Sequence, residues 1–125
     1  MGRFRTFLLG MARGRWGGAL MQGVLSHFSF VLPVDRLEET DSLLAFHHPH
    51  PSYALHILLV PKRAYRSWME LEVQDRGVLQ DMVVVSQHLI ERFNLEEEGY
   101  RLIVNGGANQ DVDVLHLHLI SDAEI

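Results

Sequence analysis

Apolar positions recur along the chain with two different spacings, and the change between them predicts an α+β domain. Across residues 75–93 the apolar side chains return every three or four positions, which is typical of an amphipathic helix. Shorter apolar runs, bounded by polar, glycine or proline residues, predict strands on both sides of it. We expect these strands at residues 34–39, 43–47, 53–60, 100–104 and 112–120.

The order of these elements favours an antiparallel sheet with helices on one face. Residues 34–47 should form a hairpin, because a polar turn separates its two apolar runs. In the last strand, alternate positions place leucines on one face and Val114, His116 and His118 on the other. The leucines of that strand are Leu115, Leu117 and Leu119.

The beginning of the chain differs in charge from the rest. Residues 1–34 hold four arginines and no acidic residue, so the formal net charge of −5 leaves −9 on residues 35–125. We expect a basic, apolar extension with helical segments over residues 1–33, followed by one domain over residues 34–125. Contact of residues 1–28 with a membrane surface or a partner is an alternative use of this segment.

Composition excludes several classes of function. The acidic balance of the domain argues against binding to nucleic acid, which needs a basic surface. The chain has no cysteine, which excludes disulfides, thiolate metal sites and a cysteine nucleophile, and fits the reducing cytoplasm as the expected location. No apolar stretch reaches the ~18 residues of a membrane-spanning helix, so we expect no such span.

Eight histidines are many for 125 residues, and two of them, His116 and His118, occupy alternate positions of the last predicted strand. Their Cβ atoms should lie roughly 6.5–7 Å apart on one face, given a rise of ~3.3 Å per residue. That spacing suits two contacts to one phosphate group, and it also suits two ligands of one metal ion. A neutral imidazole is a competent nucleophile at phosphorus near pH 7.

Two segments carry a resemblance to a known family. The closing segment, Gln110-Asp111-Val112-Asp113-Val114-Leu115-His116-Leu117-His118, follows Asn105-Gly106-Gly107 and resembles the last motif of the histidine-triad (HIT) superfamily. Leu44-Ala45-Phe46, with the later strand from His56 to Lys62, is similar to the ribose-binding turn and the strand ending in Pro-Lys of Hint-like and Fhit-like members. The first histidine of the family triad is replaced here by Val114.

The resemblance implies a HIT-like fold, a five-stranded antiparallel sheet with two helices, and a homodimer in which two sheets join. It also implies a nucleotide-binding hydrolase or transferase that takes a purine nucleotide conjugate, either a nucleoside phosphoramidate or a dinucleoside polyphosphate. Such an enzyme cleaves at the α-phosphate through a nucleotidyl-histidine intermediate, which water resolves. This chemistry requires no metal and no other cofactor.

The resemblance also assigns roles to individual residues. His116 is the implied nucleophile, His118 the implied contact to the phosphate oxygens, and His56 the residue that tunes their hydrogen bonds. The residues implied to lie along the phosphate and the leaving group are Asn105, Gln110 and Asp111. The residues implied to line the nucleoside pocket are Phe46, His48, Pro49 and Leu37, of which position 48 is usually aspartate in Hint-like members.

Val114 leaves the level of activity open, because valine offers no hydrogen bond. One lost charge-assisted contact costs about 1.5–3 kcal/mol, or roughly 10–150-fold in rate. A nucleotide-binding protein with weak or no catalysis is therefore an alternative, and a third is a metal-binding protein that uses the strand pair and one loop histidine. His47, His48 or His50 is a candidate to fill the place left at Val114.

Overall fold

The computed structural model describes residues 36–122 of the chain. The expected extension over residues 1–33, its contact with a membrane surface and the domain boundary at residue 34 lie outside the described residues. Within residues 36–122, no helix combines the length and the apolar character needed to cross a membrane.

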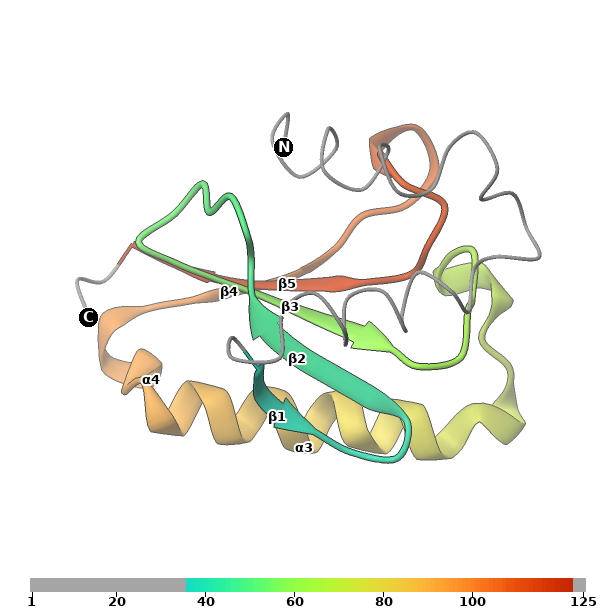
Figure 1. Ribbon diagram of the computed structural model, residues 1–125, viewed down its shortest axis with the longest axis horizontal. Coiled ribbons are helices and arrows are strands. Elements are labelled where there is room, and N and C mark those ends of the chain that lie inside the picture. The colour runs from blue at the N-terminus through green and yellow to red at the C-terminus, as the bar shows by residue number, and fades with distance from the viewer. Residues whose placement is uncertain (1–35, 123–125) are drawn as a thin grey trace.

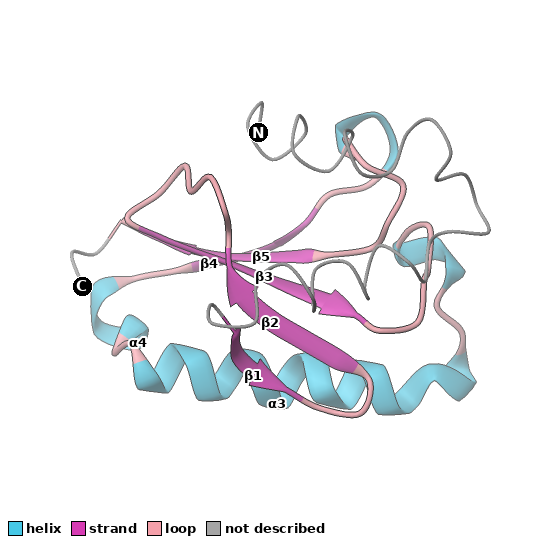
Figure 2. Ribbon diagram, in the orientation of Figure 1, coloured by secondary structure: helices cyan, strands magenta, loops and turns pink. Residues whose placement is uncertain are grey.

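Five strands form one antiparallel sheet, as the sequence predicts (Figure 1, Figure 2). Their bounds are β1 Arg36–Glu39, β2 Leu43–His47, β3 Leu55–Pro61, β4 Arg101–Val104 and β5 Leu117–Ser121. The order across the sheet is β1-β2-β3-β5-β4, and the predicted hairpin is the antiparallel pair of β1 with β2. The two strands that hold most of the candidate chemistry, β3 and β5, are therefore neighbours in the middle of the sheet.

One long helix, α3, lies along a single face of the sheet (Figure 1). It spans Arg76–Arg92, and the apolar period over residues 75–93 predicts it closely. Asn94 adopts the left-handed conformation (φ 56°) and leads into the single turn of α4, Leu95–Glu98. The short 3₁₀ turns of the described part of the chain are η3 Trp68–Glu70, η4 Val73–Asp75 and η5 Gly107–Asn109.

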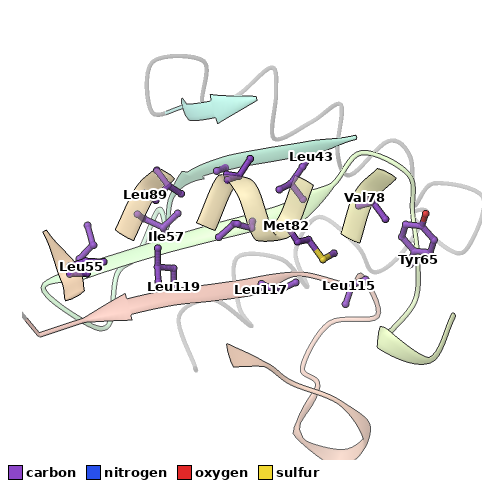
Figure 3. Close-up of a cluster of buried hydrophobic side chains, with 14 residues drawn as sticks. Leu43, Leu55, Ile57, Tyr65, Val78, Met82, Leu89, Leu115, Leu117 and Leu119 are labelled. Carbon is purple, nitrogen blue, oxygen red and sulfur yellow. The ribbon is translucent and has the colours of Figure 1, made fainter. Parts of the chain in front are cut away.

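The main core fills the space between α3 and the sheet (Figure 3). Leu43, Ile57 and Leu119 project from the sheet, while Met82 and Leu89 project from α3 toward them. Each such side chain contributes about 1.5–3 kcal/mol when it is removed fully from water. We call this side of the sheet the α3 face.

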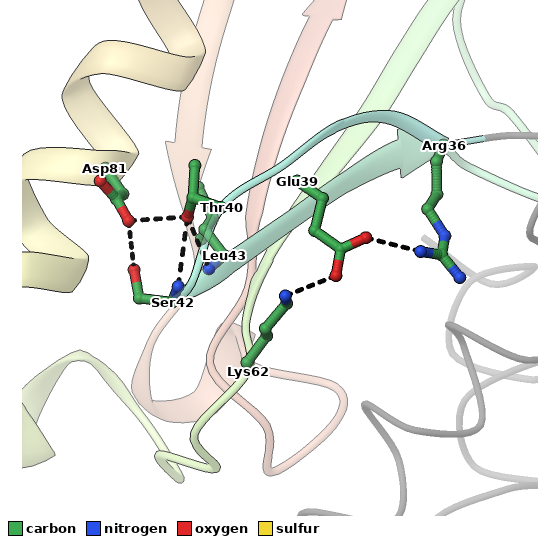
Figure 4. A network of polar contacts seen from close by, with 7 residues as sticks. All are labelled: Arg36, Glu39, Thr40, Ser42, Leu43, Lys62 and Asp81. Atoms are coloured by element: carbon green, nitrogen blue, oxygen red, sulfur yellow. Dashed lines mark hydrogen bonds and ion pairs between the residues drawn. The ribbon is translucent and has the colours of Figure 1, made fainter.

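A polar network ties the β1–β2 turn to α3 (Figure 4). The hydroxyls of Thr40 and Ser42 donate to the carboxylate of Asp81 on α3, at 2.6 and 2.7 Å. The Thr40 hydroxyl oxygen also accepts from the backbone N–H groups of Ser42 and Leu43. These bonds fix the register of the hairpin against the helix.

The last strand is shorter than predicted. It begins at Leu117, and the expected strand over residues 112–120 is wrong in its first half. The reason is that the backbone there pairs with a loop: the Leu115 N–H donates to the Tyr65 carbonyl at 2.8 Å. The predicted alternation still holds, because Leu115, Leu117 and Leu119 all belong to the core on the α3 face.

Candidate active site

Strand geometry brings His56 and His118 together on the side of the sheet opposite α3, which we call the histidine face. Ile57 of β3 pairs with Leu119 of β5, and both belong to the core on the α3 face. Because side chains alternate along a strand, the preceding residues His56 and His118 point the other way. Both are buried, with 3% and 2% of their surface exposed.

The hydrogen bonds of His56 determine which of its nitrogens carries the proton. Its Nδ1 accepts from the backbone N–H of Ser52 at 3.1 Å, and its Nε2 lies 2.9 Å from Nδ1 of His118. A neutral imidazole has one donor and one acceptor nitrogen. His56 therefore donates from Nε2, His118 accepts at Nδ1, and the proton of His118 resides on its Nε2.

His116 has the opposite tautomer. Its Nδ1 lies 2.6 Å from the carbonyl oxygen of Val114, and a carbonyl can only accept. The proton of neutral His116 is therefore on Nδ1, and the lone pair is on Nε2. The ring stands 4.9 Å from the ring of His118, nearly perpendicular to it at 70°. A nucleophilic nitrogen and a donor nitrogen thus belong to adjacent rings.

A fourth imidazole, His48, joins these three from the loop after β2. Its ring centroid lies 4.4 Å from that of His56, with a tilt of 30° between the planes. Its Nδ1 accepts from the backbone N–H of His50 at 2.9 Å. The ring contacts run from His48 through His56 and His118 to His116, and we call these four residues the histidine cluster.

Burial lowers the pKa of all four imidazoles, because the charged form loses its hydration. The pKa falls to about 4 for His56 and His116, and to about 3 for His48 and His118. At His116 a backbone hydrogen bond and the charge of Asp111 act against burial without reversing its effect. The cluster is therefore neutral at pH 7, which the nucleophilic form of an imidazole requires.

Among the residues expected along the phosphate, Gln110 is held by the backbone. Its side-chain nitrogen donates to the carbonyls of Arg66 at 2.6 Å and Val112 at 2.8 Å, so it fixes the turn that precedes His116. Asp111 is half-buried in that turn, and its charge acts on His116. Asn105 follows the β4–β5 pair Val104–Leu117, which places it at the end of the sheet where His116 enters β5.

The residues expected in the nucleoside pocket fall on two sides of the sheet. Phe46 pairs with Leu58, which in turn pairs with His118, so Phe46 lies on the histidine face. Pro49 is half-buried, one residue after His48. Leu37 instead packs against the core on the α3 face, so its side chain does not join the histidine cluster.

Two observations bear on position 114, where the resemblance leads us to expect a histidine. The Val114 side chain is buried and apolar, yet its carbonyl still holds His116 in one tautomer. Of the three candidates, His48 joins the cluster by ring contact, whereas His47 at the end of β2 is exposed and meets Phe93 at 6.3 Å, and His50 is exposed. The imidazole of His48 contacts His56, and in the order of ring contacts it lies at the opposite end of the cluster from His116.

The arrangement of side chains does not suit the metal-binding alternative. Within residues 36–122, no three histidine, aspartate or glutamate side chains are placed to hold one metal ion. The nitrogens of His56 and His118 face each other at 2.9 Å, and Nδ1 of His116 is directed to a carbonyl.

Sequence reasoning missed the backbone groups of Ser52 and Tyr65, because a backbone contact leaves no residue-type signal.

Comparison with known proteins agrees with the fold. The model of the HIT domain family matches residues 29–125, so the chain belongs to this family. An uncharacterised HIT-like protein of Buchnera aphidicola is 29% identical over 97 residues, which cover 76% of this chain and 87% of the relative.

Solved structures show the same architecture. A HIT family hydrolase from Legionella pneumophila superposes with a TM-score of 0.71 at 25% identity, covering 83% of this chain and 92% of that one. A histidine triad nucleotide-binding protein from Candida albicans gives a TM-score of 0.65 at 26% identity, covering 76% and 70%. The family thus includes proteins named for hydrolysis and for nucleotide binding.

Proposed function

We propose that this HIT domain protein hydrolyses a nucleotide conjugate at its α-phosphate, with His116 as the nucleophile. The observation that carries the proposal is the fixed pair of tautomers, with a lone pair on Nε2 of His116 and a proton on Nε2 of the neighbouring His118. The names of the Legionella and Candida relatives support a hydrolase that binds nucleotides.

The chemistry follows from these two nitrogens. The Nε2 lone pair of His116 forms a bond to the α-phosphorus, and the bond from phosphorus to the leaving group breaks with its electron pair. The Nε2–H of His118 donates to a phosphoryl oxygen as negative charge develops there. Water then attacks the nucleotidyl-histidine and releases the nucleoside monophosphate. The proton that this water gives up balances the proton that the leaving group takes up from solvent, and His116 is neutral again.

The surrounding residues define where the substrate would lie. We place the phosphates beside Asn105 and the turn of Gln110 and Asp111, because that turn leads directly into His116. The nucleoside lies on the side of Phe46, His48 and Pro49, and a purine base is our preferred ligand. Leu37 is not part of this pocket, since its side chain packs on the α3 face.

The test is release of AMP from an adenosine phosphoramidate by the full chain, with His116→Ala beside it. We expect release by the wild type and at least a 1,000-fold loss in the variant, on the order of a lost nucleophile. His47→Ala is the matched control, because this exposed histidine lies outside the cluster. Unchanged release by His116→Ala would show that another group attacks phosphorus.

A dinucleoside polyphosphate is the second substrate to assay, since it presents a similar α-phosphate.

A nucleotide-binding protein without catalysis is the alternative function. Val114 is the observation that favours it, because its side chain supplies no hydrogen bond. That alternative predicts AMP binding by calorimetry together with no AMP release from either substrate.

We also propose a homodimer joined along β4. This strand is an edge of the sheet, and it presents exposed apolar residues at Leu102 and Val104, with Tyr100 just before it. Gln87 and Ile90 of α3 line one surface pocket with Tyr100, which shows that α3 borders the same edge. An unpaired apolar edge strand is a template for pairing with another strand.

Light scattering after size-exclusion chromatography tests this interface. The wild type should elute with twice the mass of one chain, and Leu102→Glu should elute with the mass of one. Met69→Glu serves as the control, because Met69 is 85% exposed and lies in η3, outside the β4 edge. A monomeric wild type would contradict the proposed dimer.

A further inference from the structure

We propose that His48 is a positioning residue for the reaction: its ring holds His56 in the orientation that fixes the proton on Nε2 of His118. This role rests on the proposed function, because it describes how the donor beside His116 is kept in its working tautomer. The ring of His48 lies against that of His56, and the effect proposed here reaches His118 through the hydrogen bond of His56.

The geometry around His56 shows how the ring is held. The ring of His48 lies against one side at 4.4 Å, and the ring of Tyr53 meets it edge-on at 5.4 Å and 72°. The Ser52 N–H donates to Nδ1 in the plane of the ring. The two ring contacts and this hydrogen bond together restrict rotation about the side-chain bonds of His56.

His48 is itself fixed by the chain around it. Its Nδ1 accepts from the His50 N–H, two residues on, which closes a tight turn in the loop after β2. The His48 N–H also donates to the His56 carbonyl at 2.8 Å, so the backbone holds the two residues side by side. The ring contact therefore follows from a local fold that two separate bonds maintain.

The orientation of His56 determines the tautomer of His118 through the hydrogen bond between them. The Nε2–H of His56 points at Nδ1 of His118, and this keeps the proton of His118 on Nε2. If His56 turned away, both tautomers of His118 would be populated, and one of them presents a lone pair to the phosphate. The expected cost is that of one ordinary hydrogen bond, about three- to tenfold in kcat.

Two substitutions distinguish the contribution of the His48 ring from that of its hydrogen bond in the turn. His48→Asn keeps an acceptor for the His50 N–H, since asparagine forms the same turn, but it removes the ring. His48→Phe keeps a ring of similar shape and removes the acceptor. If His48 only stabilises the loop, His48→Asn should have the milder effect. If its ring positions His56, His48→Phe should have the milder effect.

The experiment measures kcat and KM for AMP release and, in the same proteins, the ¹⁵N chemical shifts of the imidazole nitrogens. We expect His48→Asn to lose three- to tenfold in kcat, with the His118 signals moving toward a mixture of tautomers. His48→Phe should lose less and keep a single tautomer. His47→Ala, a neighbouring histidine outside the cluster, should match the wild type.

The role is overturned if His48→Asn keeps the single tautomer of His118, whatever happens to the rate. It is also overturned if His48→Phe is the more damaging variant in both measurements. The nitrogen shifts need no substrate, so they decide the positioning role even if the wild type releases no AMP. Failure of the proposed function and failure of this inference are thereby distinguished.

Discussion

The two faces of the sheet are built on different principles. The α3 face is held by apolar side chains that repeat with the period of a strand or a helix, as Leu43, Ile57 and Leu119 do against Leu89. The histidine face also buries apolar side chains such as Phe46 and Leu58, but its imidazoles are positioned by single polar contacts, several of them to backbone groups such as the Val114 carbonyl and the Ser52 N–H. Apolar burial therefore contributes on both faces, whereas the candidate chemical groups lie on one of them.

Acid should have the largest effect on stability, and it should act through the histidine face. Unfolded histidines bind protons below about pH 6.5, whereas the cluster stays neutral until about pH 4, because burial lowers each pKa. Stability is thus fully present above pH 6.5 and is lost as the pH falls toward 4, by roughly 1.4 kcal/mol per pH unit for each proton. Denaturant unfolding between pH 7 and pH 5 measures this slope.

His56→Gln provides the control for the acid effect, because glutamine does not titrate. Its slope should be shallower than that of the wild type by about one proton. Equal slopes in the two proteins would contradict a buried, neutral His56. The paired carboxylates, including that of Asp81, have a pKa already below the usual range and so contribute little change above pH 5.

Leu89→Ala tests the α3 face alone. Leu89 is almost fully buried between α3 and the sheet, so its truncation should cost about 2–5 kcal/mol in the free energy of unfolding. AMP release per folded molecule should stay at the wild-type level, because the histidine cluster lies on the other face. Chemical denaturation measures the loss in the free energy of unfolding, and a single-point kinetic assay measures AMP release per folded molecule.

Val114→His tests the histidine face alone. An imidazole at this position adds a donor beside His116 and should raise the rate of AMP release by about tenfold or more, if one charge-assisted contact is restored. The backbone carbonyl of residue 114 remains to hold His116. Val114→Ala is the control, and a gain as large in that variant would mean that space, rather than the imidazole, raises the rate.

Asp81→Ala should have the smallest effect. The substitution removes two hydrogen bonds that join α3 to the β1–β2 turn, which together contribute about 1 kcal/mol at this partly exposed site. Asp41→Ala changes a neighbouring exposed carboxylate and should leave the unfolding midpoint unchanged. A midpoint shift in both variants would point to net charge instead of the network.

These two faces also differ in how far sequence could predict them. The period of apolar residues located α3 and all five strands, because burial leaves a repeating pattern of side chains. The start of β5 was wrong, since the pairing of Leu115 with the Tyr65 carbonyl depends on a loop that no pattern marks. Leu37 was placed by resemblance in the nucleoside pocket, but packing draws it to the α3 face.

The histidines themselves were found from the sequence, yet their protonation was not. Resemblance singled out His56, His116 and His118, and the alternation of the last strand put the latter two on one face. The tautomers depend on Ser52 N–H and the Val114 carbonyl, and backbone atoms are common to every residue type. The ring contact of His48 with His56 likewise required three-dimensional coordinates.

The central claim is that Nε2 of His116 attacks phosphorus, and the most direct test is to locate the intermediate. The full chain is mixed rapidly with adenosine phosphoramidate and quenched in alkali, in which the nitrogen–phosphorus bond survives. Peptide mapping by mass spectrometry should then find one AMP group on the tryptic peptide that begins at Leu102, at His116. An AMP group on His118 or His56, or turnover by His116→Ala at the wild-type rate, would contradict the claim.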